Sequence, residues 1–350
     1  MVPPSGSRPQ TRWEDDEYVL SRIHRDGEAR LLVRSRFGER PEILARLEHV
    51  HELRDVLDPA WATRPLSLER QDGGDALLLE DPGGEFLSTL VGRPWELRAF
   101  LRVAIGIAEA LRQLHKQSIV HKDVKPAHIL VDAGTGKAWL TGFGISSRIP
   151  RERQSPPEIV AGSPAYMAPE QTGRMNRSVD SRSDLYAFGI TLYEMLTGEL
   201  PFTAATATEW IHCHVARAPK PPGERVQGIP PPVEEIVLKL LSKTPEHRYQ
   251  TAAGVEADLR RCLTGLESSG RVEAFPLASQ DISDRLLIPE RLYGRERDVE
   301  TLLAAFDGFV AKGTPELVLV SGAPGVGKSS VVNELHKSLT IARGLFASGK

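Results

Sequence analysis

Eight residues near the C-terminal end of the chain combine glycine, lysine and serine at a spacing that suits phosphate binding. The segment Gly322–Ser329 reads Gly-Ala-Pro-Gly-Val-Gly-Lys-Ser and satisfies the pattern G-x-x-x-x-G-K-[ST] in full. In such a loop the backbone amides hold the α and β phosphates, Lys328 reaches the β and γ oxygens, and the Ser329 hydroxyl holds magnesium. We expect ATP and Mg²⁺ to bind here. The residues expected to bind the nucleotide are Gly322, Gly325, Gly327, Lys328 and Ser329.

The sequence around this loop has the order that a phosphate-binding loop requires. A Leu- and Val-rich run, Glu316–Val320, is predicted to be a buried strand that leads into the loop, and helix-like sequence follows. No Walker B carboxylate is recognisable before residue 350, so the sequence predicts binding and not hydrolysis. The residues after the loop are too few to close a doubly wound sheet. We expect a fragment of a longer α/β domain.

A second constellation lies in the middle of the chain. The segment His121–Leu130 reads His-Lys-Asp-Val-Lys-Pro-Ala-His-Ile-Leu and resembles the catalytic loop of protein kinases, H-R-D-L-K-P-x-N-[IL]-L. The resemblance implies that Asp123 accepts or orients the hydroxyl of a substrate. It implies that Lys125 balances the charge of the migrating phosphoryl group, as the lysine of serine/threonine kinases does.

Three further motifs follow in the order that this family has. Gly162–Glu170 resembles the end of an activation segment, with Ala-Pro-Glu at its anchoring position. Asp184 resembles the helix aspartate that braces the catalytic loop, and Arg248 matches the arginine that pairs with the activation-segment glutamate. Each motif alone is common loop chemistry, but chance does not produce four in this order. The resemblance covers about Tyr18 to Leu266 and implies a two-lobed protein-kinase fold.

The coarse pattern of the chain agrees with an α+β protein whose small lobe is β-rich and whose large lobe is helical. Predicted strands are Tyr18–Ile23, Ala29–Val33, Glu42–Leu47 and Ala76–Leu79. Predicted helices cover about Leu97 to Leu114, a stretch from about Asp184 to a stop at Gly198, and about Val233 to Leu241.

The metal-binding positions of the kinase-like segment depart from the family. Magnesium requires hard oxygen ligands, which the family supplies from the D-F-G aspartate and the last catalytic-loop asparagine. Here the D-F-G position reads Thr-Gly-Phe-Gly, so Gly142 replaces the carboxylate. His128 replaces the asparagine, and imidazole is a poor ligand for magnesium.

The phosphate-binding positions of the small lobe are also altered. The strand lysine of the family aligns best with Arg46, within the predicted strand Glu42–Leu47, and an arginine keeps the charge but changes its shape. The phosphate-covering hairpin, expected at Ile23–Arg30, contains one glycine instead of three. The helix glutamate of the family has two candidates, Glu48 and Glu52, and neither is assigned.

Two functional hypotheses follow. The favoured one is a pseudokinase, a kinase-shaped regulatory and interaction module that transfers little or no phosphate, because several transition-state contacts are lost together. The alternative is an active serine/threonine protein kinase with a non-standard, manganese-based metal site built from His128 and a nearby carboxylate such as Asp132.

The segment Leu292–Arg297 resembles the entry segment of AAA-type and related signalling ATPases. The whole order resembles the beginning of large bacterial signalling proteins that combine serine/threonine kinase, ATPase and sensor histidine kinase parts. We predict a disordered N-terminus (1–15), a kinase-like domain (16–266), a linker (267–288) and a partial AAA-type P-loop domain (289–350), which we expect to act as a nucleotide-controlled switch.

Composition limits the remaining possibilities. The 350 residues carry a formal net charge of −3, which predicts no electrostatic attraction to nucleic acid or anionic lipid. Cys213 and Cys262 are predicted to be buried free thiols, and no signal peptide or membrane span is expected. We expect a cytoplasmic protein that binds ATP and a protein substrate or signalling partner, including downstream domains of a longer chain.

Overall fold

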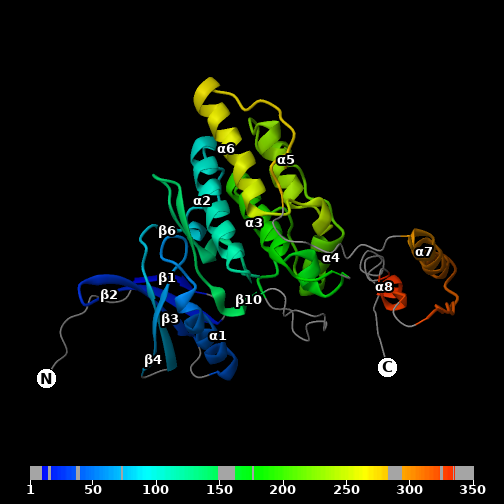
Figure 1. Cartoon of the computed structure of the whole chain (residues 1–350), viewed down its shortest axis with the longest axis horizontal. Helices are drawn as coiled ribbons and strands as arrows, with labels where there is room; N and C mark the ends of the chain where they lie inside the picture. The colour runs from blue at the N-terminus through cyan, green and yellow to red at the C-terminus, as the bar shows by residue number, and fades with distance from the viewer. Residues whose placement is uncertain are drawn as a thin grey trace.

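The structure is a computed structural model of the chain, and it shows a β-rich lobe beside a helical lobe (Figure 1). It describes residues 10–14, 17–36, 40–71, 74–148, 162–175, 177–282, 294–323, 326–333 and 335. The prediction of disorder for residues 1–15 is wrong at Gln10–Glu14, which form a strand, and the other residues of that stretch lie outside the described set. The two-lobed α+β architecture predicted from the sequence is confirmed.

The elements have the following bounds. The strands are β1 (Gln10–Glu14), β2 (Tyr18–Arg25), β3 (Glu28–Ser35), β4 (Pro65–Gln71), β5 (Gly74–Glu80), β6 (Glu85–Phe86), β7 (Ile119–Val120), β8 (Ile129–Asp132), β9 (Lys137–Leu140) and β10 (Ser147–Arg148). The helices are α1 (Pro41–Glu52), α2 (Leu97–Lys116), α3 (Ser181–Thr197), α4 (Ala207–Val215), α5 (Pro231–Leu240), α6 (Ala252–Ser269), α7 (Glu296–Lys312) and α8 (Lys328–Asn333).

The small lobe is an antiparallel five-stranded sheet in the order β1-β2-β3-β5-β4. Strands β2 and β3 are joined by the two-residue turn Asp26–Gly27, in which both residues have positive φ, as a tight hairpin of this twist requires. Leu20, Leu31 and Leu77 pack into the main core on one face of the sheet. The alternation along each strand therefore fixes which side chains face the helical lobe.

The strand predicted at Glu42–Leu47 is wrong, because this segment lies in helix α1. Pro41 occupies the first turn, where a missing N–H costs nothing. Ile43, Leu47 and Val50 are buried at intervals of four and three residues, which is the period of a helix packed on a sheet. A short apolar run cannot distinguish the two structures until its packing partner is known.

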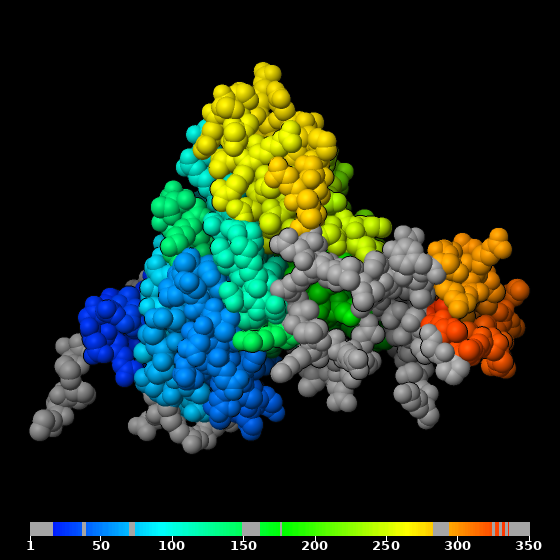
Figure 2. All heavy atoms as spheres, in the orientation of Figure 1, coloured from blue at the N-terminus to red at the C-terminus, as the bar shows by residue number. Residues whose placement is uncertain are grey.

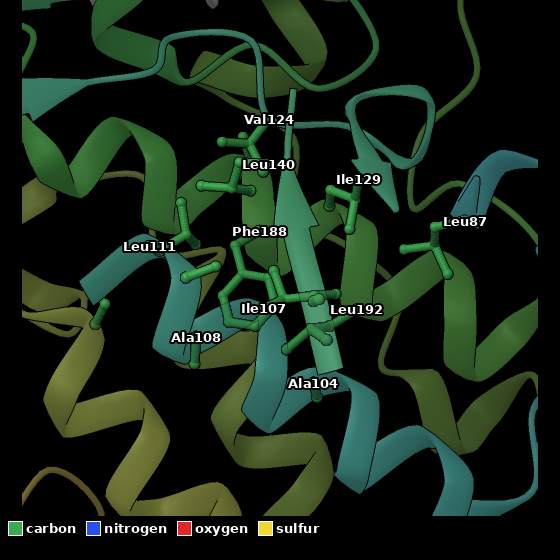
Figure 3. Close-up of a cluster of buried hydrophobic side chains, with 14 of the residues drawn as sticks. Leu87, Ala104, Ile107, Ala108, Leu111, Val124, Ile129, Leu140, Phe188 and Leu192 are labelled. Carbon is green, nitrogen blue, oxygen red and sulfur yellow. The ribbon is translucent and has the colours of Figure 1, made fainter. Parts of the chain in front are cut away.

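Helix α3 forms the centre of the large lobe. Its Phe188 lies among side chains of α2 and of the strands β8 and β9, as Figure 3 shows for Ile107, Leu111 and Leu140. Val124 and Ile129 join the same cluster from the segment around His121–Leu130. The buried core thus fixes the backbone on either side of the polar residues that the sequence singles out. The three predicted helices are confirmed as α2, α3 and α5.

A buried ion pair ties the Gly162–Glu170 segment to the large lobe. The Arg248 guanidinium donates to both carboxylate oxygens of Glu170, at 2.6 and 2.8 Å, and both side chains are 0–1% exposed. The same guanidinium also donates to the backbone carbonyls of Arg182, Ser242 and Lys243. This is the pairing that the sequence predicted for Arg248.

The described part of the segment predicted to be a linker, residues 267–282, is packed against the large lobe. Helix α6 continues to Ser269, and residues 270–282 then run back along it, with Val272, Phe275 and Leu277 packed against the core. The polar composition of this segment did not predict this packing, because much of the contact consists of hydrogen bonds between carboxylates and backbone amides. Residues 283–288 lie outside the described part of the chain.

The Glu316–Val320 run does not form the predicted strand. These residues have no regular structure, and Leu317 and Leu319 are 92% and 83% exposed. A strand needs neighbours to pair with, and none of the described strands lies beside this run. Helix α8, which begins at Lys328, agrees with the helix predicted after the glycine-rich loop.

Cys213 and Cys262 are buried free cysteines, as predicted. Among the helices in the described ranges, none has the length and apolar character needed to cross a bilayer.

We predict that Arg248→Ala lowers the free energy of unfolding by about 3–5 kcal/mol, because it leaves the Glu170 carboxylate buried without its partner. Urea denaturation measures the change. Arg260→Ala is the matched control, since the Arg260 side chain is 52% exposed and its partner Glu256 keeps Arg112, so removal should cost less than about 1 kcal/mol. Equal losses in the two variants would contradict a special role for the buried pair.

Candidate active site

The His121–Leu130 loop is held by Asp184 at the start of helix α3. The Asp184 carboxylate accepts the backbone N–H groups of His121 and Lys122, each at 2.8 Å, and the ring N–H of His115 at 2.9 Å. Lys122 has φ +69°, a left-handed conformation that is unfavourable for a residue with a side chain. Three donors on one fully buried carboxylate fix this turn, which is the bracing role predicted for Asp184.

Asp123 lies at the base of the cleft between the lobes and is bonded to the activation segment. Its Oδ1 accepts the backbone N–H of Ser163 at 2.7 Å, and its Oδ2 lies 3.2 Å from Lys125 Nζ. Lys125 also donates to the Ser163 hydroxyl at 2.6 Å. Burial raises the pKa of Asp123, but His128, Lys125 and the Ser163 amide outweigh it and bring the pKa to about 2.

The ring of His128 fills the space beside Gly142. Its Nδ1–H donates to the Asp123 backbone carbonyl at 2.8 Å, and a Cβ on Gly142 would stand 2.5–2.6 Å from three ring atoms. Gly142 has φ +79°, which favours glycine. Burial, and then the charge of Lys125, lower the pKa of His128 to about 3, so the ring is neutral at pH 7.

Arg46 reaches the cleft from helix α1 and not from a strand. Its Nη1 donates to Glu17 Oε2 at 2.5 Å, and its Cβ packs beside Gly144. The family's lysine stands on the third strand. Here β3 presents Val33 to the cleft, and Arg34, one residue on, faces the opposite, exposed side. In the family the cation of this ion pair is on the strand and the anion is on the helix. Here the cation, Arg46, is on the helix and the anion, Glu17, is beside the sheet.

The hairpin that borders the cleft is the one between β1 and β2. Glu17 and Tyr18 line the cavity, whereas the turn Asp26–Gly27 does not, so the prediction of Ile23–Arg30 as the covering hairpin is wrong. The sequence from Glu14 to Glu17 reads Glu-Asp-Asp-Glu and contains no glycine. The sequence did not predict strand β1. The predicted covering hairpin was therefore the one between β2 and β3 and not the one between β1 and β2.

A second ion pair joins strand β2 to the connection between the lobes. Arg22 donates to both carboxylate oxygens of Asp81 and, at 3.0 Å, to the Gly84 carbonyl. The Asp81 side chain is 1% exposed. Arg22 and Asp81 were not singled out by the sequence, since a lone arginine in a strand carries no signal without its partner.

The cleft itself is a cavity of about 480 Å³ with an apolar roof and a polar floor. Val33, Leu77 and Leu79 contribute to the roof, and Asp123 and Thr141 contribute to the floor. Neither Arg22 nor Asp81 lines it.

A series of hydrogen bonds joins the activation segment to the helices of the large lobe. His214 on α4 donates from Nε2 to the Pro164 carbonyl at 2.8 Å, and its Nδ1 accepts from the Tyr186 hydroxyl at 3.0 Å. Lys243 donates to the same hydroxyl at 3.2 Å. Burial, and then Lys243, lower the pKa of His214 to about 3. Pro164 lines the cleft, so this series helps to place Ser163 at Asp123.

The residues of the kinase-like cleft do not fit a magnesium ion. In the part of the chain that the structure describes, no group of three or more His, Cys, Asp or Glu side chains is placed to hold a metal. The carboxylate that the family supplies is replaced by Gly142, and the ring of His128 occupies the neighbouring space.

The glycine-rich loop near the C-terminus precedes helix α8. Lys328 is folded back onto the loop, where its Nζ donates to the carbonyls of Gly322 and Ala323 at 2.9 and 2.8 Å. Gly322 and Gly327 have φ +157° and +86°. Gly325 lies outside the described residues, and Ser329 is placed only as part of the helix backbone. The loop that would hold phosphate thus stands at a helix N-terminus with its lysine beside it.

Comparison with known proteins agrees with this geometry. Residues 79–258 match the protein kinase domain family, and residues 291–350 match the AAA ATPase domain family. The chain belongs to the protein kinase family. Its kinase domain is followed by the beginning of an AAA ATPase domain, as the sequence predicted. The kinase match begins at Leu79, so Arg22, Val33 and Arg46 lie in the part of the small lobe that it does not cover.

The relatives that it resembles include kinases of bacteria and a hybrid kinase of a eukaryote. Serine/threonine-protein kinase PknB of Mycobacterium tuberculosis is 34% identical over 257 residues, which cover 70% of this chain and 40% of PknB. Hybrid signal transduction histidine kinase G of Dictyostelium discoideum is 35% identical, with 49% and 6% covered. Serine/threonine-protein kinase Pkn1 of Myxococcus xanthus is 35% identical, with 53% and 27% covered. The chain spans less than half of each relative.

We predict that His214 makes the kinase domain less stable in weak acid. The unfolded chain protonates this ring near pH 6.5, whereas the folded protein keeps it neutral down to about pH 3. The contribution of the neutral His214 ring to the free energy of unfolding is therefore present above pH 6.5 and is lost as the pH falls. Between pH 7 and pH 5 the native protein should lose about 2 kcal/mol more unfolding free energy than His214→Gln, which does not titrate there. Equal losses in urea denaturation would contradict a neutral buried ring.

We also predict that Gly142 and His128 behave as one unit. Gly142→Asp alone should lower the free energy of unfolding by about 2–4 kcal/mol, from the contact with the ring and the left-handed backbone. Adding His128→Asn removes the ring and should recover part of that loss. Thermal and urea denaturation of the two single variants and the double variant measure the coupling. Strictly additive effects would show that the ring does not exclude a side chain at position 142.

Proposed function

We propose that the kinase domain of this chain is a pseudokinase that serves as a regulatory and interaction module, and that ATP binds instead at the P-loop of the following domain. The observation that carries this proposal is the His128 ring against Gly142. The metal-binding carboxylate of the family has neither its side chain nor the space for one, and the remaining imidazole is a poor ligand for magnesium.

Charge compensation within the cleft supports the same conclusion. Arg46 is paired with Glu17, Lys125 with Asp123, and His128 is neutral. A nucleoside triphosphate would have to compete with these internal partners for each cation. It would also bring its phosphates close to the Glu17 carboxylate. The cleft is thus poorly suited to a highly charged ligand, whereas the kinase fold around it is intact.

The alternative remains an active serine/threonine kinase with a non-standard metal site. Its support is the contact of Asp123, Lys125 and Ser163, which leaves the catalytic carboxylate ionised at neutral pH. Against it, Asp132 does not line the cleft. Its carboxylate accepts the backbone N–H groups of Gly134 and Thr135 in an exposed turn, so it is not placed to join His128 in a manganese site.

At the P-loop we propose that the backbone amides and Lys328 hold the phosphates of ATP and that the Ser329 hydroxyl holds Mg²⁺. Gly322, Gly325 and Gly327 give the loop its close approach to the phosphates. In a longer protein this domain would act as a nucleotide-controlled switch for the kinase module. We place the chain in the cytoplasm, where its two buried thiols stay reduced.

Phosphate transfer from labelled ATP to protein tests the proposal. The full chain is assayed with magnesium and then with manganese, beside Asp123→Ala, which controls for contaminating kinases. We expect the same background in both proteins. Binding of labelled ATP is measured in parallel, and Lys328→Ala should abolish it while Asp123→Ala leaves it unchanged.

Each outcome decides between the hypotheses. Transfer that Asp123→Ala abolishes would overturn the pseudokinase assignment and establish a rebuilt metal site. ATP binding that survives Lys328→Ala and is lost on substitution in the cleft would place the nucleotide in the kinase domain.

A further inference from the structure

The segment Gly270–Ile282, which we call the strap, is bound to the large lobe by two carboxylates. Asp281 accepts the backbone N–H of Gln250 at 2.5 Å, and the N–H and hydroxyl of Thr251 at 2.9 and 2.7 Å. Thr251 is the N-cap of helix α6. Further back, Asp258 of α6 accepts the N–H of Ala278 at 2.7 Å and the Tyr249 hydroxyl at 2.6 Å. In Figure 2 the amber strap lies directly on the yellow surface of α6.

Helix α6 has glycines where the strap comes closest. A Cβ on Gly254 would stand 2.5–2.6 Å from Asp281 side-chain atoms, and one on Gly265 would stand 2.9 Å from the Arg271 carbonyl. Glycine inside a helix costs about 0.5–1 kcal/mol relative to alanine. These two positions therefore weaken the helix and at the same time make room for the strap at both its ends.

Hydrogen bonds continue from the strap to the activation segment. Gln250, whose N–H is bound by Asp281, accepts from Arg182 at 3.2 Å and donates to the Arg248 carbonyl at 2.8 Å. Arg248 in turn holds the Glu170 carboxylate, and Glu170 also accepts the Ser183 hydroxyl at 2.8 Å. Glu170 ends the segment that places Ser163 at Asp123. The route is thus a contiguous set of buried and half-buried polar contacts.

We propose that the strap is a coupling element, in which Asp281 positions the Arg248–Glu170 anchor and thereby the activation segment of the kinase domain. The strap lies immediately before the stretch that leads to the P-loop domain. A pull or rotation on that stretch would act first on Asp281, since Ile282 beyond it is 78% exposed and makes no comparable contact. When Asp281 is released, Gln250 loses its fixed position beside Arg248, and the activation segment loosens. Asp281 and Gln250 are positioning residues, and neither touches Asp123.

Two variants release the strap from opposite sides. Asp281→Asn removes the charge that holds Gln250 and Thr251, and Gly254→Ala leaves Asp281 intact but fills the space that it occupies. Glu273→Gln is the matched control, because it removes one negative charge from an exposed position of the same strap. Hydrogen–deuterium exchange of the full chain is followed for residues 162–170, with the amides of helix α2 as an internal reference for global unfolding.

We expect both releasing variants to speed exchange in residues 162–170 about tenfold, because a charge-assisted contact has been lost, while α2 is unchanged. Glu273→Gln should match the native protein. Faster exchange confined to the strap would show that it is only an anchor and would overturn the proposal, as would an equal increase in α2. The measurement does not use phosphate transfer, so its failure leaves the pseudokinase assignment untouched.

Discussion

The cleft depends on the contact of the buried Asp184 carboxylate with the backbone of the catalytic loop. This carboxylate accepts two consecutive backbone N–H groups, from His121 and Lys122, and thereby holds Lys122 in a left-handed conformation that a side chain disfavours. The turn so formed sends Asp123 into the cleft. The apolar Val124 and Ile129 then anchor the loop in the core. A charged residue at 0% exposure is retained here because it satisfies the backbone of a loop that could not otherwise bend this way.

The pseudokinase that we propose would keep the shape of the kinase fold without its chemistry. This chain has the contacts that build the fold, such as those of Asp184 with the catalytic loop and of Arg248 with Glu170. Near the positions where the family binds a metal and phosphates, residues of this chain contact one another: His128 packs against Gly142, and Arg46 pairs with Glu17. The first contact lies within the large lobe and the second within the small lobe.

Two parts of the chain bear on nucleotide binding, and their environments differ. Among the described residues that line the kinase cleft, Arg46 and Lys125 each have an anionic partner, which disfavours phosphate. At the P-loop, Lys328 is bonded only to backbone carbonyls in the contacts described for it, and these are weak competitors for a lysine compared with phosphate oxygens. Along the chain the strap lies between these two parts, and it makes its own specific contacts to the large lobe.

The sequence alone determined the kinase fold, the order of its motifs, the large-lobe helices and the P-loop, because these depend on local patterns: helical periodicity and fixed motif spacing. It also identified Gly142 and His128 as departures. Only the tertiary structure decided that Glu42–Leu47 is helical, that Arg46 pairs with Glu17, and that Arg22 closes onto Asp81. The physical reason is that these depend on partners far away in the chain, and the energy of an ion pair or a packed face appears only when both sides are in place.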